Sequence, residues 1–379
     1  MKYYLIVGEP SGDLHGANLM KGLLKADPQA EFRFWGGDKM AAVGGADNLV
    51  MHYRKTSFFG FLNVLKNLRT IGRQLSACQA DIAAWRPDVV ILVDYPGFNM
   101  KIARWAHEAG FRVHYYIAPK VWAWKEWRVK QIQKYVDQLY IIFPFEKEYF
   151  PKFGIAPHFE GNPLVDAIEE RRSSFPTGEQ FRAENGLDSR PIVALLAGSR
   201  PTEIRSNLRL MAELATRIPD RQFVVAGVSW LDPALYEQYT AGYPVRFVQD
   251  KTYELLSVSE AAIVTSGTAT LETAIIGIPE VVVYEIPWLY EKLRSLVVKI
   301  PFVSLVNLNL GREAVREIVE HNPDPAMTEA EVRSILIGGA KREKMLCDFD
   351  ELRTIIGDKG ASDRFALDMV KRLKAATKN

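Results

Sequence analysis

The chain has 379 residues, of which 48% are hydrophobic and 25% charged, so it is long enough for two globular domains of ordinary size. Its formal net charge of +2 gives no reason to expect a nucleic-acid partner, and any electrostatic role must be local. Its two cysteines, Cys78 and Cys347, exclude a disulfide framework and match no zinc-binding spacing, which favours a reducing, cytosolic location.

The first predicted element is a buried strand. The apolar run of MKYYLIVGEPSGD ends within a few residues and meets Glu9 and Asp13, which is typical of a strand and not of a signal peptide. No stretch approaches the ~20 apolar residues that a membrane-spanning helix needs. We therefore expect any contact with a membrane to be peripheral.

Short apolar, β-branched runs alternate with longer amphipathic stretches, which predicts an α/β protein with parallel sheets. Amphipathic helices are predicted between the strands, for example at Gly16–Lys25 and Leu208–Arg217. The predicted strands are Tyr3–Val7, Val89–Val93, Val113–Ile117, Leu139–Phe143, Ile192–Leu196, Gln222–Ala226, Ala262–Val264 and Val281–Tyr284.

A polar stretch without repeats, Arg171–Arg190, separates two series of these units. We therefore expect two doubly wound parallel-sheet domains that face each other across a cleft, followed by C-terminal helices. The expected bounds are 1–175, 190–345 and 346–379. Ligands of such sheets bind outside the carboxyl ends of the strands, so the loops at those ends are the places to search for function.

The first of these loops is GEPSGDLHGANL, which matches neither the G-x-G-x-x-G nor the G-x-x-x-x-G-K-[ST] nucleotide fingerprint. Its polar side chains are Glu9, Ser11, Asp13 and His15. Glu9 and Asp13 are candidate catalytic carboxylates, and Ser11 and His15 are candidates for an acceptor site. The alternative is an ordinary strand-to-helix turn in which Ser11 or Asp13 caps the helix.

Residues 54–77 form a basic stretch with no acidic residue before Asp81. This composition, with aromatic residues among the apolar ones, is typical of an amphipathic helix in a membrane interface. The alternative is a core helix with a solvated basic face. The candidates for contact with the membrane or with an acceptor substrate are Phe58, Phe59, Phe61, Leu62, Lys66, Arg69 and Arg73.

The loop DYPGFN follows the buried run VVILV directly. A carboxylate just past a buried strand is well placed for general-base work, so Asp94 is a candidate catalytic residue. Pro96 and Gly97 force a turn that would fix it. The alternative is an Asx-turn that caps the next helix.

Residues 115–132 combine three tryptophans with several basic residues. Such a segment suits a phosphate, the face of a sugar or a membrane surface, and core packing alone accounts poorly for three tryptophans so close together. Its candidates for the acceptor or the membrane are Trp122, Trp124 and Arg128.

The loop LLAGSRPTEI, residues 195–204, predicts a phosphate contact. Gly198 and Ser199 are expected to expose backbone N–H groups, and the guanidinium of Arg200 has a fork that matches phosphate geometry. Glu203 suits the first turn of the following helix.

A second loop in the same half, TSGTATLE, precedes a predicted helix. Ser266, Gly267 and Thr268 lead into its N-terminus, where free N–H groups form an anion site. Glu272 lies one turn in and can accept two hydrogen bonds from a ribose diol. Together the two loops predict a site for a nucleotide diphosphate.

Metal and cofactor patterns are weak in this sequence. The six histidines are scattered without a metal-binding spacing, and no metal or other cofactor is expected. Asp348-Phe349-Asp350 is literally D-x-D, but it falls in a helical stretch where a solvated helix face is the preferred interpretation. Arg200 and the helix N-terminus would neutralise a leaving diphosphate instead.

Taken in order, these motifs resemble the lipid-A-disaccharide synthase family over nearly the whole chain. Two departures from the family's usual pattern are Pro10, where alanine is usual, and Glu320, where a glutamine would stand. The matching segments are GEPSGDLHGA, DYPGFN, P-x-VWAW-x-x-x-R-V, FPFE, GNPLVD, GSR-x-x-EI, SGTATLE and the VNL…GRE stretch.

The resemblance implies a GT-B arrangement in which the C-terminal domain binds UDP, the N-terminal domain binds the acceptor, and the transfer is inverting and metal-independent. The implied donor is UDP-2,3-diacylglucosamine, and the implied acceptor is 2,3-diacylglucosamine 1-phosphate. The products would be a β-1,6-linked lipid A disaccharide 1-phosphate and UDP. The resemblance also implies a homodimer, peripheral on the cytoplasmic face of the inner membrane.

Four residues gain a role from the resemblance. Asp94 matches the family's important aspartate and Arg200 its GSR arginine, while Asn307 and Arg312 of the VNL…GRE stretch join the donor site. Three alternatives stay open at this point. They are a transferase acting on a polyprenyl-linked acceptor, a UDP-sugar epimerase, and a nucleotide-sugar-binding module without catalysis.

Overall fold

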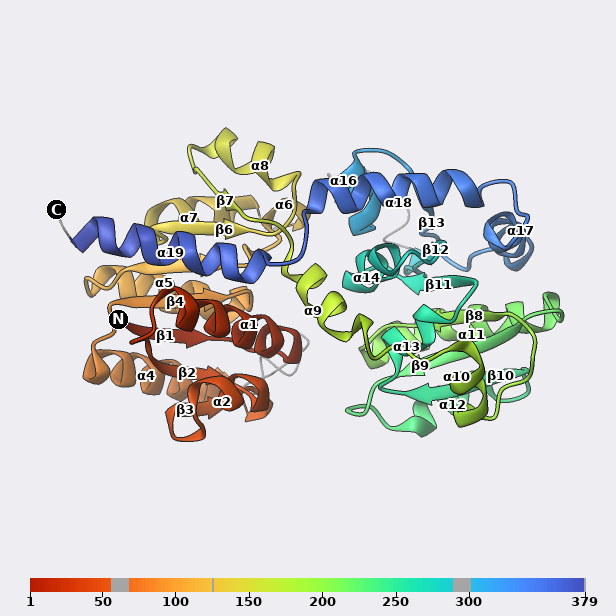
Figure 1. Ribbon diagram of the computed structural model, residues 1–379, viewed down its shortest axis with the longest axis horizontal. Helices are drawn as coiled ribbons and strands as arrows, with labels where there is room; N and C mark the ends of the chain where they lie inside the picture. Colours follow the sequence, from red (N-terminus) through yellow and green to blue (C-terminus); the bar gives the residue numbers. More distant parts are fainter. Residues whose placement is uncertain (56–67, 125, 289–300, 378–379) are drawn as a thin grey trace. The chain divides into compact units, whose positions relative to one another are not determined.

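The computed structural model describes residues 1–55, 68–124, 126–288 and 301–377 (Figure 1). Its contacts divide the chain into two compact units. Unit 1 comprises Met1–Ala167 and Ile356–Asn379, and unit 2 comprises Ile168–Ile355. The last helix of the chain therefore belongs to unit 1 and does not form a separate C-terminal group.

Unit 1 is built on a seven-stranded sheet in the order β3-β2-β1-β4-β5-β6-β7. Every pairing in it is parallel. The order reverses between β1 and β4, which is the switch point where doubly wound sheets bind ligands. The strands are β1 (Lys2–Ile6), β2 (Glu31–Gly36), β3 (Leu49–His52), β4 (Val89–Val93), β5 (Val113–Tyr116), β6 (Gln138–Ile141) and β7 (His158–Phe159).

Alternate strand residues of unit 1 pack toward different helices. Tyr4 and Val90 belong to the hydrophobic core that contains residues of α4, α5 and α7, whereas Tyr116 and Tyr140 contact Phe365 of α19. This is the two-residue period of a sheet that is covered on both faces. The helices are α1 (Pro10–Ala26), α2 (Asp38–Gly44), α4 (Leu68–Trp85), α5 (Pro96–Glu108), α6 (Val121–Trp124), α7 (Val129–Tyr135), α8 (Glu146–Tyr149), α9 (Pro163–Arg172), which crosses into unit 2, and α19 (Ala361–Thr377).

Helix α19 packs along α1 (Figure 1). A Cβ added at Gly22 of α1 would lie 2.9 Å from the Cβ of Ala366, so glycine allows this close approach. The carboxylate of Asp166 accepts hydrogen bonds from the N–H groups of Gly360, Ala361 and Ser362, which satisfies the start of α19. These contacts explain why the C-terminal helix joins the first unit.

Unit 2 repeats the same design with a six-stranded sheet in the order β10-β9-β8-β11-β12-β13. All of its pairings are parallel, and its switch point lies between β8 and β11. The strands are β8 (Ile192–Leu196), β9 (Gln222–Gly227), β10 (Val245–Gln249), β11 (Ala261–Thr265), β12 (Glu280–Val283) and β13 (Arg316–Ile318).

The core of unit 2 contains alternate residues of its central strands, such as Ala194 and Leu196, together with Leu255 and Leu256 of α13. Helices α11 and α17 contact the same sheet. The helices are α10 (Gly178–Asn185), α11 (Pro201–Arg217), α12 (Pro233–Thr240), α13 (Thr252–Ser257), α14 (Thr268–Ile276), α16 (Leu305–Leu310), α17 (Pro325–Ile335) and α18 (Arg342–Ile356).

The fold class predicted from the sequence is confirmed, because both units are parallel α/β sheets and the chain ends in helices. All eight predicted strands are present within a residue or two. Strands β2, β3, β7, β10 and β13 were not among those predicted. They are short, or they carry polar residues as β10 (VRFVQ) does, so they lack the apolar run of a central strand.

The predicted amphipathic helix of residues 54–77 falls largely outside the described residues. Arg69 and Arg73 lie on α4, and both side chains are exposed. The other candidates of this segment, Phe58, Phe59, Phe61, Leu62 and Lys66, are not among the residues that the structure describes. In the described part of the chain, no helix is long and apolar enough to span a membrane.

Candidate active site

Both sheets bring their candidate loops together at the switch point. In unit 1, Ile6 of β1 pairs with Leu92 of β4, so the loops carrying Glu9 and Asp94 lie side by side at the carboxyl ends of these strands. In unit 2, Leu196 of β8 pairs with Val264 of β11, so Gly198–Arg200 and Ser266–Thr268 are neighbours in the same way. Each unit therefore presents a site of its own at the place where such sheets bind ligands.

Asp94 is held in an unusual backbone conformation. Its φ is 43° and that of Tyr95 is 49°, and left-handed conformations at two successive residues with side chains are uncommon. The Asp94 carbonyl oxygen accepts hydrogen bonds from the hydroxyl of Tyr115 at 2.6 Å and from the amide of Asn99 at 2.8 Å. The same amide also donates to the carbonyls of Ile6 and Val93, which ties this turn to the sheet.

The electrostatic surroundings of Asp94 suit a proton acceptor. Burial raises the pKa of its carboxyl, while the charge of Lys120 and a backbone hydrogen bond from Tyr95 lower it. A raised pKa makes the carboxylate a better base than an exposed one. Lys120 follows β5, the next strand of the sheet, and its side chain is exposed.

The first loop packs closely on the Asp94 turn. A Cβ added at Gly8 would lie 2.3 Å from the ring of Tyr95, so only glycine allows this contact. Burial, together with the nearby charge of Glu9, raises the pKa of Tyr95 to about 12. Glu9 is half-buried and stands at the N-cap of α1 without a side-chain capping bond. Its charge acts on Tyr95 in the Asp94 turn, so Glu9 remains a candidate for the site.

Asp13 has a structural role, and we correct its assignment as a catalytic carboxylate. It is buried, and its two oxygens accept hydrogen bonds from the backbone N–H groups of Gly37, Lys39 and Met40 at 2.7, 3.0 and 3.2 Å. These are orphan donors at the start of α2, so Asp13 acts as a helix cap from a distant part of the chain. Each of its two oxygens already accepts a hydrogen bond from the backbone.

The two other candidates on α1 differ in exposure. Ser11 is exposed. His15 is buried, and its Nδ1 has no hydrogen-bond partner among the described residues. Burial lowers the pKa of His15 to about 4, so its imidazole is neutral at physiological pH.

The aromatic and basic segment after β5 lies beside the Asp94 loop. A hollow of about 210 Å³ is lined by residues that include Pro96, Lys101, Trp127 and Arg128. The indole of Trp127 is 61% exposed, and the Arg128 guanidinium lies 5.5 Å from its ring centroid. Trp122 is half-buried. The side chain of Trp124 is not among those that the structure describes.

A further carboxylate, Glu146, was missed by the sequence analysis. It follows β6 in the FPFE segment and is fully buried at the same sheet edge as Asp94. The signal that identified Asp94, a carboxylate just past a buried strand, was present here as well.

In unit 2, the carboxylate of Glu203 hydrogen-bonds back to the backbone of the GSR loop. Gly198 has a φ of +105°, and a Cβ added there would lie 2.4 Å from Oε2 of Glu203. Oε2 accepts hydrogen bonds from the N–H groups of Ser199 and Arg200 at 3.0 and 3.2 Å. The expectation that Ser199 exposes its N–H to a ligand is therefore wrong for the structure as it stands. Glu203 holds the loop in shape instead.

The side chain of Arg200 is 60% exposed and lies 3.4 Å from Oε1 of Glu203. Its charge also acts on Tyr284, which follows β12, and partly offsets the burial that raises the pKa of that hydroxyl. Trp230, after β9, is 59% exposed, and its indole N–H donates to the carbonyl oxygen of Ser199 at 3.3 Å. An accessible cation thus lies beside an exposed indole and a half-buried phenol.

The second loop leads into α14 as predicted. Gly267 is the N-cap residue of α14, which has nine residues. The hydroxyl of Ser266 donates to the carbonyl oxygen of Val303, so this side chain fixes the loop. Thr268 is the first helical residue and is exposed. The first N–H groups of a helix have no partner inside it, and they favour an anion.

Glu272 is set one turn into α14, where it already has a partner. One of its oxygens, Oε1, accepts a hydrogen bond of 2.6 Å from the hydroxyl of Tyr253 on α13. Burial raises the pKa of Glu272. The guanidinium of Arg171 lies 5.4 Å from the Tyr253 ring centroid. Among the described residues no side chain donates a hydrogen bond to the other oxygen of this carboxylate, which keeps Glu272 a candidate ribose ligand.

Asn307 is a structural residue, and its assignment as a donor contact is corrected. It is fully buried, and Oδ1 accepts from the N–H groups of Ala314 and Val315. Its Nδ2 donates to the carbonyl of Val315 and to the carboxylate of Glu317. Two acceptances and two donations use the full capacity of an amide.

Arg312 is also occupied by contacts within the protein. Its guanidinium pairs with Glu351 at 2.6 Å and with Asp348 at 2.8 Å, both on α18. Asp348 also pairs with Lys344, and Asp350 pairs with Arg353. The D-x-D sequence lies on a helix as predicted, but only Asp350 is solvated, whereas Asp348 is buried in ion pairs with Arg312 and Lys344. Arg312 anchors its loop to this helix.

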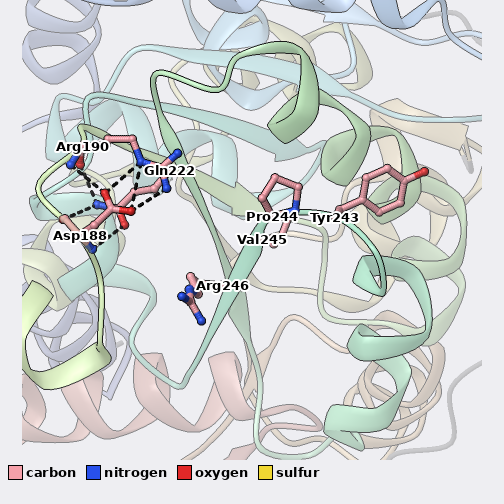
Figure 2. Close-up of a pocket in the computed structure, with 7 residues that line it drawn as sticks. All are labelled: Asp188, Arg190, Gln222, Tyr243, Pro244, Val245 and Arg246. Carbon is pink, nitrogen blue, oxygen red and sulfur yellow. Dashed lines mark hydrogen bonds and ion pairs between the residues drawn. The ribbon is translucent and has the colours of Figure 1, made fainter.

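A cavity of about 200 Å³ lies at the amino-terminal ends of strands in the unit 2 sheet (Figure 2). It is lined near the starts of β8, β9 and β10, and two of its charged groups, Asp188 and Arg190, pair with each other. Arg190 contacts Asp188 at 2.6 Å, and Gln222 donates to the carbonyl of Asp188 at 2.8 Å (Figure 2). This cavity is not the candidate site.

Solved structures establish the class of protein to which the fold belongs. A putative UDP-N-acetylglucosamine 2-epimerase from Listeria monocytogenes has a TM-score of 0.63 and 14% identity, over 99% of this chain and 97% of the other. Sucrose-phosphate synthase from Thermosynechococcus elongatus has a TM-score of 0.62 and 15% identity, over 99% and 100%. This is the GT-B fold of glycosyltransferases and UDP-sugar epimerases.

Sequence comparison defines the particular family. A family model described as lipid-A-disaccharide synthetase matches residues 3–360. The lipid-A-disaccharide synthase of Myxococcus xanthus strain DK1622 is 35% identical over 376 residues, which cover 97% of each chain. The chain belongs to the lipid-A-disaccharide synthetase family.

Proposed function

We propose that this chain transfers 2,3-diacylglucosamine from its UDP donor to the 6-hydroxyl of 2,3-diacylglucosamine 1-phosphate. The products are a β-1,6-linked lipid A disaccharide 1-phosphate and UDP. The observation that carries the proposal is the family match over residues 3–360. The loops at the two switch points agree with it, because one offers a carboxylate and the other a cation with a helix N-terminus.

In unit 1, Asp94 serves as the general base. Its carboxylate takes the proton of the acceptor hydroxyl as that oxygen forms a bond to the anomeric carbon of the donor. The bond between the anomeric carbon and UDP breaks with its electron pair going to UDP, so the configuration inverts. The fixed backbone of Asp94 and its raised pKa support this role. Glu9 is the second candidate base on this sheet edge.

In unit 2, the leaving UDP is held by fixed positive groups. Arg200 and the N–H groups at the start of α14 stabilise the charge that develops on the diphosphate. Glu272 accepts hydrogen bonds from the ribose diol. The guanidinium of Arg200 is exposed, and Glu203 fixes the loop that carries it; both facts support this assignment.

The hollow beside Asp94 suits the acceptor's anionic end. Lys101 and Arg128 supply positive charge, and Trp127 supplies an exposed apolar face. A phosphate monoester attached to a sugar needs this combination of cation and apolar surface. We therefore assign the 1-phosphate of the acceptor to this hollow.

The proposal includes a homodimer on the cytoplasmic face of the inner membrane, as the family resemblance implies. The acyl chains of both substrates are the physical reason for a contact with the membrane. The exposed Arg69 and Arg73 support a contact with anionic lipid. A flotation assay with vesicles of neutral or of anionic lipid tests this membrane contact. Reversing the charges of both Arg69 and Arg73 should weaken binding to the anionic vesicles and leave binding to the neutral ones unchanged.

Two substitutions test the proposed site in an assay of UDP release. Asp94→Ala should lower kcat by about 10²–10⁴-fold while the Kd for UDP stays unchanged. Arg200→Ala should instead raise the Kd for UDP by at least about tenfold. Nearly full turnover of Asp94→Ala would remove Asp94 from the role of base, and unchanged UDP affinity of Arg200→Ala would remove Arg200 from the donor site.

A further inference from the structure

Glu146 is a carboxylate buried among neutral hydrogen-bond donors. Its side chain is fully buried, at 0% exposure. Oε1 accepts a hydrogen bond of 3.0 Å from the indole N–H of Trp122, and Oε2 accepts one of 3.2 Å from the backbone N–H of Phe143. Both donors, an indole N–H and a backbone N–H, are neutral.

A carboxylate in this position is costly, because neutral donors only partly replace the water that an ionised group loses. Burial raises the pKa of Glu146 to about 7, while the hydrogen bond from Trp122 and the charge of Lys120 lower it. A core that needed only shape at this point would be satisfied by an apolar residue. A perturbed acid at the binding edge of a sheet is therefore a sign of function.

Trp122, the residue that Glu146 holds, is one end of an aromatic surface. Its indole packs edge-on against the ring of Phe145 at 4.9 Å, and Phe145 stacks on Phe143 at 5.7 Å with an interplanar angle of 6°. The Lys120 ammonium lies 5.9 Å from the Phe143 ring centroid. Trp122 and Phe145 are half-buried and can contact a ligand, whereas Phe143 is buried and supports Phe145 by stacking. We call Trp122, Phe143 and Phe145 the aromatic shelf.

The shelf lies at the carboxyl ends of the strands, as Asp94 does. Val93 of β4 pairs with Tyr116 of β5, which pairs in turn with Tyr140 of β6, so the loops after these strands are neighbours. The charge of Lys120 lowers the pKa of both buried carboxyls, Asp94 and Glu146, so this ammonium is close enough to act on each of them. The shelf and the candidate base thus border one region of unit 1.

We propose that Glu146 is a positioning residue that fixes the Trp122 indole so that the aromatic shelf binds the apolar face of the acceptor's glucosamine ring. Sugar rings present C–H faces that pack on aromatic side chains, and a wall fixed by a hydrogen bond loses little entropy on binding. The inference rests on the proposed function and adds to it the residues that recognise the acceptor sugar.

Steady-state kinetics with UDP release as the readout test this inference in the full-length protein. Glu146→Leu should raise the acceptor KM roughly tenfold, with kcat within about twofold and the Kd for UDP unchanged. Glu146→Gln keeps an oxygen that accepts from Trp122, so its KM should lie closer to that of the wild type. Glu148→Gln, on the exposed face of the same helix, is the matched control and should change nothing.

A double-substitution cycle separates positioning from a general loss of packing. Trp122→Phe keeps an aromatic ring but removes the N–H that Glu146 accepts, so it should also raise the acceptor KM. Combined with Glu146→Leu, it should raise KM little beyond the larger single effect, because both changes break one arrangement. Effects that multiply to roughly a hundredfold would contradict the inference.

Three outcomes are distinguishable. If Glu146→Leu and Trp122→Phe unfold at the wild-type temperature and keep the wild-type acceptor KM, the inference is wrong and the proposed function stands. If Glu146→Leu does not fold, the comparison of Glu146→Gln with Trp122→Phe decides in the same way. If the wild-type protein releases no UDP with both substrates, the proposed function fails and the inference falls with it.

Discussion

The hydroxyl of Tyr115 donates a hydrogen bond of 2.6 Å to the backbone carbonyl oxygen of Asp94. Tyr115 is fully buried in β5, and Asp94 is the residue that follows β4. A side chain of one strand therefore holds the end of its neighbour in a left-handed backbone conformation. The candidate base is fixed from the core and not by its own side chain.

Tyr115→Phe should lower kcat by about three- to tenfold, because the carbonyl oxygen of Asp94 keeps only its bond from Asn99. The free energy of unfolding should fall by about 1 kcal/mol. Tyr4→Phe is the control, because Tyr4 is an equally buried hydrogen-bonded tyrosine whose hydroxyl contacts Asp81. It should cost similar stability with kcat unchanged. Equal kcat values for the two variants would contradict a role of Tyr115 in positioning Asp94.

Gly198→Ala should weaken UDP binding by roughly tenfold, because the new Cβ conflicts with Glu203 and the loop must open. The matched control is Gly186→Ala, where φ is also positive at +62° but nothing lies within 4 Å of an added Cβ. Both variants should lose about 1 kcal/mol of stability from backbone strain. Isothermal titration with UDP should separate them, and equal affinities would show that the shape of the GSR loop is unimportant for UDP.

Asp13→Ala should act on stability and not on chemistry. Three backbone N–H groups at the start of α2 lose their acceptor, which predicts a loss of about 3 kcal/mol or more in the free energy of unfolding. The protein that remains folded should keep kcat within a few-fold of the wild type. Unchanged stability with a hundredfold or greater loss of kcat, roughly the size of a general-base effect, would restore Asp13 to the catalytic residues.

The raised pKa of the buried Glu146 should make the free energy of unfolding depend on pH. Its pKa in the folded protein is about 7, above the ordinary value of 4.5, so the native state retains a proton that the unfolded chain releases. Stability from this group is complete below about pH 4.5 and is lost as the pH rises through about 7. Relative to Glu146→Gln, the wild type should lose roughly 2 kcal/mol between about pH 5 and about pH 8. Parallel denaturation curves for the two proteins over this range would contradict the raised pKa.

The sequence predicted the loops well, because the positions of parallel strands determine where they lie. Strand β4 and the position of Asp94 were identified from the run VVILV and the segment ILVDYPGFN. The loops that leave β8 and β11 were identified from the segments LLAGSR and VTSGT. Buried apolar runs are visible without knowledge of the rest of the chain. The edge strand β10 was not predicted, since its alternating polar residues carry no such run.

The partners of polar side chains could not be predicted in the same way. Asp13 reaches Gly37 and Lys39, and Asn307 reaches Ala314, through turns whose geometry is set by tertiary packing. A carboxylate that caps a helix and one that takes a proton have the same letter in the sequence. Only the number of donors already around each one separates them.

The identity of the product tests the central claim most directly. Purified protein is incubated with UDP-2,3-diacylglucosamine and 2,3-diacylglucosamine 1-phosphate, and the products are measured by mass spectrometry and by proton NMR of the anomeric position. The account predicts one UDP released for each β-linked disaccharide 1-phosphate formed, and no UDP release when the acceptor is left out. UDP release at the same rate without the acceptor, or a UDP-sugar altered in its ring with no disaccharide formed, would contradict it.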